Sequence, residues 1–439
     1  MTILKLNLDH TLISEQALAL MMEKTKVAFM SLREKTCVGG QTHTGWFDWP
    51  RQQGFKLIRE IEAYFQEHPV NYDSVVVIGI GGSYNGTRAV EQALNHSFGH
   101  ELGSGYKPIY YLGQHLSETQ TLELFDLLAE KNPIVITVSK SGRTLEPSLG
   151  FRLAKAFLAA RYPKGYAERV LIVTEDSNAS TLKRLAEREG FGLFYLPKDV
   201  GGRYSVLSAV GILPLFYAGY PVHQLMNGAH LFFDSLHKED WQKSPALELA
   251  SLRQLYWDQG KRVDLIAISE PKLQSFCEWW KQLFGESEGK RDKGLLPSSL
   301  VYPTDLHSMG QYLQEGVNQM IETFLSFDRY ESVPTGLVER RLRVPFLSDN
   351  SDGLSYLEGK NLSEINQAAF SAAIFAHASR GVPCPHIQVA QLDAFSLGYL
   401  FAFFQTVCAV SGLLLEVNPF DQPGVETYKQ KMYELLEQN

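Results

Sequence analysis

Short apolar runs alternate with helical stretches through the middle of the chain. The runs cover 75–80, 108–112, 134–138, 169–173 and 193–196, and most segments between them carry apolar residues at helical spacing. Strands that alternate with helices in this way form parallel sheets covered by helices on both faces. The pattern therefore predicts an α/β fold with a doubly wound parallel sheet, followed by an apolar helix over 205–218.

A second round of the same rhythm follows. Its strand candidates are 265–268, 300–302, 321–327 and 386–389, again with helices between them. The segment 394–415 contains no charged residue and is long enough to cross a bilayer. It contains polar residues, however, and the chain has no second segment of this kind. We therefore expect a buried helix here, and two α/β domains in all.

The two ends of the chain have a different pattern. Residues 1–66 are expected to be mainly helical, with one helix over 12–32 and another that follows Trp49-Pro50. The stretch 328–360 is polar and irregular, which indicates a loop, and 425–439 has the pattern of a charged amphipathic helix. We expect four parts: a helical segment 1–66 that packs on the second domain, a first domain 67–218, a second domain 219–420, and a C-terminal helix 421–439.

Composition narrows the function classes. The chain has 439 residues and a formal net charge of −8, which disfavours general nucleic-acid binding. An anionic ligand would therefore need locally concentrated positive charge. Four scattered cysteines without metal-type spacing, and an N-terminus without a basic and apolar leader, indicate a cytoplasmic protein with reduced thiols.

The sequence SVVVIGIGGSYNGTR, from Ser74 to Arg88, joins a predicted strand to a helix through a glycine-rich turn. Backbone N–H groups at such a turn can hold an anion, and the hydroxyl of Ser83 can add a hydrogen bond. The turn does not fit a dinucleotide fingerprint, because Tyr84 stands where the third glycine belongs. A turn that binds nothing has the same pattern, so this stretch alone leaves both interpretations open.

A second anion candidate is TVSKSGRTLEP, from Thr137 to Pro147, which follows another predicted strand. Its hydroxyls and cationic groups precede a helix that is expected to run to Arg161, with Thr144 as the N-cap. Hydroxyls together with helix N–H groups are how proteins hold a phosphate dianion. An ordinary Ser/Thr cap is the alternative, and the density of hydroxyls favours phosphate.

Four further stretches carry chemistry that the pattern alone does not decide. Arg203 follows a double glycine and can present a planar donor fork to an anion, although a surface arginine fits equally well. Gln282 and Glu286 are four residues apart, so they share a helix face if the helix continues; an E-x-E segment is otherwise usually a solvated loop. His307 suits a proton shuttle or a structural role, and Lys429 suits a solvated helix.

Together, these stretches closely resemble the glucose-6-phosphate isomerase family, in its shorter bacterial form, from about residue 75 to 431. The most specific blocks are DVGGRYSVLSAVG at 199–211 and GLLLEVNPFDQPGVETYK at 412–429. GIGGSYNG, SKSGRTLEP, GESEGK and TDLHSMGQYLQEG match the family in the same order.

The resemblance implies two doubly wound sugar-isomerase domains and the interconversion of glucose 6-phosphate and fructose 6-phosphate through a cis-enediol, without metal or cofactor. Glu286 is implied as the base, Arg203 as the group that stabilises the enediolate, and His307 and Lys429 as helpers of ring opening. The implied substrate-binding residues are Gly82, Ser83, Ser139, Lys140, Ser141, Thr144 and Gln282. The histidine segment of this family reaches the partner's site, which implies a homodimer with shared sites.

One departure and one alternative remain. Arg143 stands where similar proteins have a small hydroxyl residue, so its contribution is open. A non-catalytic regulator that binds sugar phosphates with the same domain type would keep the Ser/Thr loops, but it would not keep Glu286, Arg203 and Lys429 together.

Overall fold

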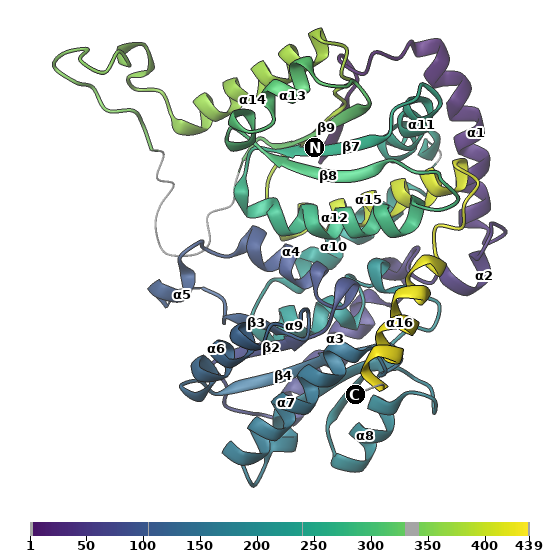
Figure 1. Ribbon diagram of the computed structural model, residues 1–439, viewed down its shortest axis with the longest axis vertical. Helices are drawn as coiled ribbons and strands as arrows, with labels where there is room; N and C mark the ends of the chain where they lie inside the picture. Colours follow the sequence, from purple (N-terminus) through teal and green to yellow (C-terminus); the bar gives the residue numbers. More distant parts are fainter. Residues whose placement is uncertain (1–2, 104, 239, 330–341, 438–439) are drawn as a thin grey trace.

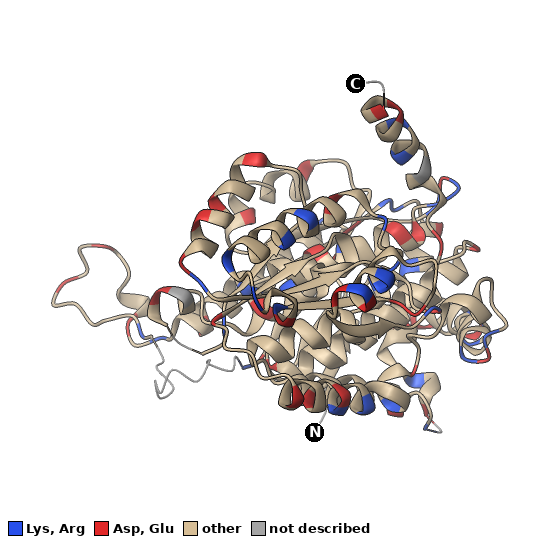
Figure 2. Ribbon diagram, turned by 90° about the horizontal axis from the view of Figure 1, so that it is seen from below, with Lys and Arg blue, Asp and Glu red and all other residues tan. Residues whose placement is uncertain are grey.

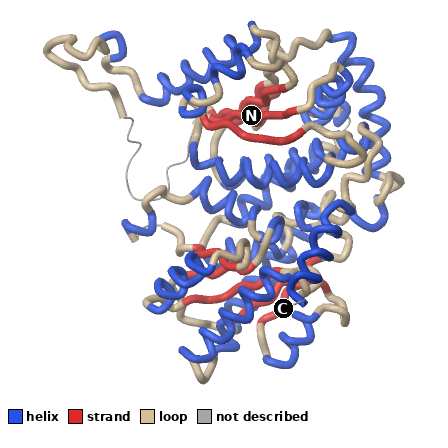
Figure 3. The backbone as a smooth tube through the Cα atoms, in the orientation of Figure 1, coloured by secondary structure: helices blue, strands red, loops and turns tan. Residues whose placement is uncertain are grey.

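The computed structural model describes residues 3–103, 105–238, 240–329 and 342–437. It contains two five-stranded sheets, and helices separate them (Figures 1 and 3). The first sheet has the order β3-β2-β4-β5-β6, with all neighbours parallel. Its strands are β2 (Ser74–Ile78), β3 (Ile109–Leu112), β4 (Pro133–Val138), β5 (Val170–Glu175) and β6 (Gly192–Leu196).

The second sheet has the order β1-β10-β9-β7-β8. Its strands are β1 (Leu4–Asn7), β7 (Val263–Ile268), β8 (Leu296–Val301), β9 (Met320–Phe327) and β10 (His386–Val389). The last four are parallel, and their order β8-β7-β9-β10 repeats the order β3-β2-β4-β5 of the first sheet. The predicted α/β fold with two parallel sheets is confirmed. The strand β1 was not predicted, and it joins β10 in antiparallel register.

Each sheet is covered on both faces, because its strands are apolar on both sides. A shared core lies between the sheets and includes side chains of helices that pack on the inner faces. These helices are α1 (Glu15–Arg33), α3 (Phe55–Glu67), α4 (Asn85–Leu94), α9 (Ala209–Ala218), α10 (Val222–Ser235), α11 (Pro245–Asp258), α12 (Gln274–Glu288) and α15 (Ala394–Leu414).

Other helices close the outer faces. The outer face of the first sheet is covered by α6 (Glu118–Ala129), α7 (Leu145–Arg161) and α8 (Thr181–Glu189). The outer face of the second sheet is covered by α13 (Gly310–Glu315) and α14 (Leu362–Ser379). The remaining helices are α2 (Gly40–His43), α5 (Gly99–Leu102) and α16 (Glu426–Glu437).

Helix α15 confirms the expectation of a buried apolar helix. By length and composition it is the one described helix that could cross a membrane, yet most of it is buried inside the protein. It packs against α10, α11 and α12. Its apolar surface is therefore explained by the shared core between the two sheets.

The other predicted segments are largely as expected. The helix predicted over 205–218 begins later, at Ala209, where Ser208 is the N-cap. Residues 342–361 are irregular apart from one short helical turn, as expected for the loop 328–360; positions 330–341 of that prediction lie outside the described residues. The C-terminal helix is α16, which projects from the body in Figure 2.

Candidate active site

The candidate site lies where the strand order of the first sheet reverses. β2 stands between β3 and β4, so the helices that follow β2 and β4 lie on opposite faces. A crevice forms at the carboxyl ends of such strands, and ligands bind there in doubly wound sheets. The two predicted anion loops, 79–83 and 139–144, follow these two strands.

The glycines of the first loop permit a close backbone approach. A Cβ atom on Gly82 would lie 2.2 Å from the carbonyl oxygen of Gly202, so only glycine lets the two turns touch. Gly81 has φ +57°, and a Cβ there would lie 2.7 Å from Nε2 of Gln282. Ser83 ends the short helical turn 81–83, just before α4. The glycine turn thus contacts the segment of the first domain that carries Arg203, and it brings this domain against Gln282 of the second domain.

In the second loop, Thr144 is the N-cap residue of α7, as predicted, but its hydroxyl makes no capping hydrogen bond in the part of the chain that the structure describes. Thr144 has extended backbone angles at the start of α7, and its side chain makes no capping hydrogen bond among the described residues. Ser139 Oγ accepts from the N–H of Gly142, and Ser141 Oγ accepts from the N–H of Arg143, each at 3.2 Å. The hydroxyl of Thr144 is therefore available to a ligand, at the positive end of α7.

Two cations of this loop contact backbone carbonyls. Lys140 Nζ donates to the carbonyl oxygens of Lys198 at 2.6 Å and Val200 at 3.2 Å, which connects the loop to the DVGGR segment. Burial lowers the pKa of the Lys140 ammonium from its usual value. Arg143 contacts the carbonyl of Ala179 at 3.5 Å. Lys140 therefore connects the second loop to the segment that carries Arg203.

Arg203 is buried, so its interpretation as a surface arginine is wrong. Its side chain is only 2% exposed, and its N–H groups make five hydrogen bonds. Nε donates to Ser287 Oγ at 2.8 Å, and Nη1 donates to Glu286 Oε2 at 3.3 Å and Gln422 Oε1 at 2.9 Å. Nη2 donates to the carbonyls of Pro419 at 2.7 Å and Asp421 at 3.1 Å. The guanidinium thus joins three distant segments of the chain at one point.

Gln282 and Glu286 share one face of α12, as predicted, because the helix continues to Glu288. Gln282 Nε2 donates to Glu286 Oε1 at 3.1 Å, and Asn85 Nδ2 donates to Gln282 Oε1 at 2.9 Å. The carboxylate of Glu286 therefore receives one hydrogen bond on each oxygen, from Gln282 and from Arg203. Its side chain remains 32% exposed, which leaves it accessible to a substrate.

The two residues after Glu286 are buried, so the E-x-E segment is not a solvated loop. Glu288 is 1% exposed, and its Oε2 accepts from Nη2 of Arg253 at 2.7 Å. Arg253 also pairs with Asp264, whose other oxygen accepts from Thr323 Oγ1 at 2.9 Å. These buried ion pairs and hydrogen bonds hold the last turn of α12 on the face of the helix opposite to Glu286.

His307 does not join this site within one chain. It is exposed and lies just after the carboxyl end of β8, next to the carboxyl end of β7 where α12 begins. Glu286 lies twelve positions after Gln274, the first residue of α12, or about 18 Å along the helix. His307 and Glu286 therefore sit near opposite ends of α12, and no described hydrogen bond or ion pair connects them.

Lys429 lies on α16, half-buried. The neighbouring Tyr428 donates from its hydroxyl to Glu146 Oε1 at 3.4 Å, which joins α16 to the first turn of α7. Figure 1 shows α16 beside α7. This contact places the helix of Lys429 next to the second anion loop.

Sequence reasoning missed three residues that the fold brings to the site. Gln422 contacts Arg203, Asn85 contacts Gln282, and Ser287 contacts Nε of Arg203. Gln422 lies in the block 412–429, in which Lys429 was the one residue predicted to belong to the site. Asn85 and Ser287 lie beside predicted site residues, so proximity in the sequence was a usable signal for both.

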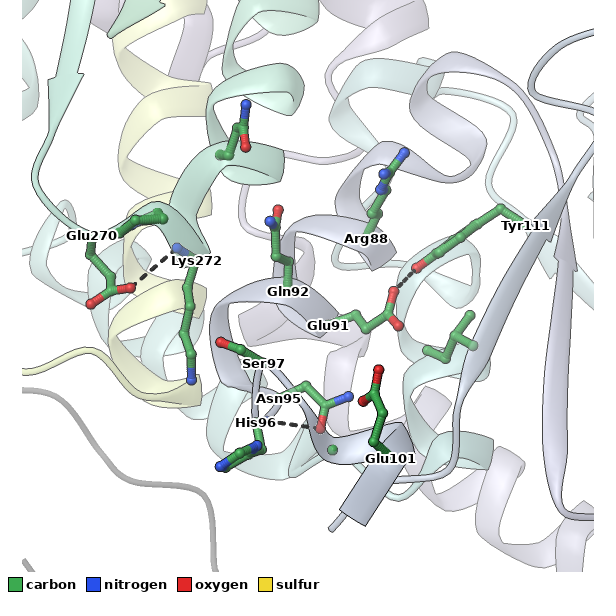
Figure 4. A pocket seen from close by; sticks show the side chains of 14 residues that line it. Arg88, Glu91, Gln92, Asn95, His96, Ser97, Glu101, Tyr111, Glu270 and Lys272 are labelled. Atoms are coloured by element: carbon green, nitrogen blue, oxygen red, sulfur yellow. Dashed lines mark hydrogen bonds between the residues drawn. The ribbon is translucent and has the colours of Figure 1, made fainter. Parts of the chain in front are cut away.

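A pocket of about 600 Å³ lies at the other end of the α4 and α12 pair (Figure 4). Glu91 and Tyr111 face each other across its wall, and the Tyr111 hydroxyl donates to Glu91 Oε2 at 2.6 Å. Burial raises the pKa of the Glu91 carboxyl to about 7. The pocket also borders Glu270 and Lys272, which precede α12, so it is separate from the site around Glu286.

Comparison with known proteins gives a consistent picture. The family model described as phosphoglucose isomerase matches residues 66–439. The glucose-6-phosphate isomerase of Bacillus cytotoxicus is 40% identical over 427 residues, which are 97% of this chain and 93% of the relative. The glucose-6-phosphate isomerase of Heliobacterium modesticaldum is 40% identical over 439 residues, covering 99% of this chain and 96% of that relative.

The fold is also shared with a solved structure. The crystal structure of the hypothetical protein TT0462 from Thermus thermophilus superposes with a TM-score of 0.87 at 28% identity, and the match covers 99% of each chain. Within the described ranges, no group of three or more His, Cys, Asp or Glu side chains is placed to hold a metal ion.

Proposed function

Because this chain belongs to the phosphoglucose isomerase family and interconverts glucose 6-phosphate and fructose 6-phosphate, we propose that Glu286 is the base of this reaction. The observation that carries the proposal is the contact between Glu286 and the buried Arg203. Aldose–ketose isomerisation needs one carboxylate to move a proton between C2 and C1, and one fixed positive charge where the enediolate forms. These two groups supply both requirements at one accessible point.

The phosphate group of the substrate binds at the two loops of the strand-order reversal. Ser139, Lys140, Ser141 and Thr144 hold it from the second loop, and Gly82 and Ser83 from the first. Binding energy at this remote group positions the sugar for proton transfer. The support for this role is the available hydroxyl of Thr144 at the start of α7, close to Lys140.

Proton transfer proceeds in two steps through a cis-enediol. Glu286 takes the proton from C2 of the open-chain aldose while Arg203 stabilises the negative charge that develops on the carbonyl oxygen. The proton on the C2 hydroxyl passes to O1, and Glu286 returns its proton to C1, which gives the ketose with its carbonyl group at C2. Gln282 lines the site and orients the carboxylate through its hydrogen bond to Oε1.

Ring opening precedes this step, and His307 and Lys429 assist it. His307 would act in the site of a second subunit, since it lies near the opposite end of α12 from Glu286 of its own chain. This geometry supports a homodimer in which each site receives a histidine from the partner.

An exposed apolar segment supports the same dimer. Leu342, Phe346 and Tyr356 are 68%, 76% and 70% exposed, and Phe375 on the neighbouring α14 is 69% exposed. Figure 1 shows that the segment 342–361 extends away from the body on the side of α13 and α14. Apolar surface of this kind is typical of a protein interface. A second copy of the chain is the partner that would cover it.

The proposal includes the organisation of the chain. Residues 67–218 and 219–420 form two sugar-isomerase domains, and 421–439 contain the helix α16 that carries Lys429. In the N-terminal segment 1–66, β1 and α1 pack on the second domain, as predicted, whereas α3 packs on α9 and β6 of the first domain. The pairing of β1 with β10 and the repeated strand order support this division. Four free cysteines are consistent with a cytoplasmic location. The reading as a non-catalytic regulator is not favoured, because the chain's relatives are enzymes.

A coupled assay tests the proposed chemistry. The protein should convert fructose 6-phosphate to glucose 6-phosphate at the same rate with and without a chelator. In deuterium oxide the product should carry deuterium at C2, because the base exchanges its proton with solvent during some turnovers. Activity without any solvent label in repeated trials would favour direct hydride transfer over a cis-enediol.

A further inference from the structure

The N–H groups of Arg203 are already fully used by the protein. Its five N–H groups match five described hydrogen bonds, and four of these go to partners other than Glu286. Two acceptors are backbone carbonyls, whose positions follow the fold. Ser287 is different, because it is a side chain on the same helix turn as Glu286. A guanidinium held this way has little freedom to turn toward a substrate by itself.

A chain of buried polar groups continues from this contact. Ser287 Oγ lies 3.3 Å from the hydroxyl of Tyr204, which donates to Cys408 Sγ at 3.7 Å. Cys408 Sγ in turn donates to the carbonyl of Leu283 at 3.3 Å, so the chain returns to α12 one turn before Ser287. Ser287, Tyr204 and Cys408 are at most 2% exposed. Solvent water therefore has no access to these positions and would not replace a hydroxyl or thiol that a substitution removes.

We propose that Ser287 is a positioning residue that, with Tyr204 and Cys408, sets the orientation of the Arg203 guanidinium toward the enediolate. The inference rests on the proposed role of Arg203 and extends it. The serine hydroxyl accepts a hydrogen bond from Nε, whereas Glu286 accepts one from Nη1 of the same planar guanidinium. Loss of the serine hydroxyl leaves Nε–H buried without an acceptor, and the planar group must then rotate or shift relative to Glu286.

The hydrogen-bonded side chains of Ser287, Tyr204 and Cys408 are chemically suited to a fixed, neutral role. Burial raises the pKa of the Cys408 thiol to about 12, with Glu288 adding to the effect, and burial also raises the pKa of Tyr204 well above its usual value. Both groups therefore stay protonated and act as donors over the working range of pH. Their function is geometric, and neither needs to exchange a proton with the substrate.

Three variants separate orientation from packing. Ser287→Ala removes both volume and acceptor, whereas Ser287→Cys keeps the approximate volume but offers a weak acceptor. Tyr204→Phe keeps the ring that stacks on Trp46 at 4.7 Å and removes only the hydroxyl from the chain. All assays contain a reductant, because a cysteine at 287 would face Cys408. Thermal unfolding of each variant checks that the protein is folded.

The readout compares two inhibitors. A sugar-phosphate hydroxamate carries a planar anion that imitates the enediolate, whereas sorbitol 6-phosphate carries the phosphate and hydroxyls alone. Ser287→Ala and Ser287→Cys should both lower kcat about 10- to 100-fold and weaken the hydroxamate by a similar factor, with KM and sorbitol 6-phosphate affinity within about threefold of wild type. Tyr204→Phe should show the same split with a smaller factor.

Other results would overturn the inference in recognisable ways. If Ser287→Cys behaves as wild type, or if both inhibitors weaken equally, Ser287 contributes packing and not orientation. If kcat of folded Ser287→Ala is unchanged, the contact has no role in positioning. Failure of the wild-type protein to isomerise the sugar phosphates, or retention of full activity by an Arg203 variant, would instead reject the proposed function. The two failures are therefore distinguishable.

Discussion

Arg203 Nη1 lies 3.3 Å from Glu286 Oε2, although the two residues are 83 positions apart in the sequence. The arginine comes from the loop that follows the first sheet, and the glutamate from the last turn of α12, beside the second. The contact therefore spans the two halves of the molecule. A fixed cation next to an accessible carboxylate is the arrangement that a proton transfer through an enediolate requires.

Arg203→Lys tests the cation. Lysine keeps the charge but loses the planar fork, and it cannot satisfy Ser287, Glu286 and the two carbonyls together. We expect kcat to fall about 10²- to 10³-fold while KM changes little, because the lost contacts matter most when negative charge develops. Steady-state kinetics give both values. A variant with normal kcat and a much higher KM would make Arg203 a ligand of the bound substrate.

Glu286→Gln tests the base. Glutamine keeps the size of the side chain but cannot accept a proton from carbon, so turnover should fall about 10²- to 10⁴-fold while sugar-phosphate binding is retained. Isothermal titration with sorbitol 6-phosphate and a turnover assay measure the two effects. Glu278→Gln is the matched control, since Glu278 is on the same helix and 52% exposed. Wild-type turnover in Glu286→Gln would place the base elsewhere.

The phosphate loop makes a separable prediction. Thr144→Ala, and Ser139→Ala combined with Ser141→Ala, should weaken both sorbitol 6-phosphate and inorganic phosphate. Each lost hydrogen bond to the charged group should cost about 1.5–3 kcal/mol of binding free energy. Thr121→Ala is a suitable control, because its hydroxyl bonds within α6 to the carbonyl of Ser117. Calorimetric affinities equal to wild type in both loop variants would remove this loop from the site.

Local patterns predicted the strands and the facing pair on α12, because both depend on neighbours in the sequence. Gln282 and Glu286 meet as the spacing of four requires. The alternation of Leu4 and Leu6 in β1 was visible in principle, but a strand of four residues carries too short a pattern to separate it from a loop. Its pairing with β10, near the other end of the chain, carries no local signal.

The partners of the buried charged side chains could not be predicted either, because they are distant in the sequence. Arg203 bonds to carbonyls 216 and 218 positions away, and backbone acceptors have no sequence signature. Glu288 looks solvated in the sequence because its partner, Arg253, lies 35 residues before it. The sequence therefore indicated candidate charged residues for the site, but their pairing depends on how the two domains pack.

Glu91 predicts a pH dependence of stability. Burial raises the pKa of its carboxyl to about 7, above the usual 4.5. A carboxyl with a raised pKa in the folded state binds a proton that the unfolded state releases, so its contribution to stability is present below pH 4.5 and is lost as the pH rises through 7. Glu91→Gln keeps a group that can accept the hydrogen bond of Tyr111 but carries no charge. At pH 8 it should be more stable than wild type by up to about 3 kcal/mol.

Denaturant unfolding between pH 5 and pH 8 measures this effect. The difference between Glu91→Gln and wild type should grow with pH over this interval and level off above it. Glu101→Gln, which changes an exposed carboxylate of the same pocket, should leave the profile unchanged. A constant difference between Glu91→Gln and wild type across the range would mean that Glu91 is ionised in the folded protein throughout.

Mixed subunits test the shared site. His307 and Glu286 lie near opposite ends of α12, so a site that uses both must draw them from two chains. His307→Ala and Glu286→Gln should each be nearly inactive as pure proteins. After the two variants are refolded together, a mixed dimer should contain one site with both residues intact and one site with neither. In an equal mixture half of the dimers are mixed, and half of the sites in these dimers are intact. Up to about a quarter of the wild-type activity should therefore return. Differently tagged subunits and tandem purification show that mixed dimers have formed. Purified mixed dimers that remain inactive would show that each site takes its residues from a single chain, and that His307 acts, if at all, without crossing to the partner.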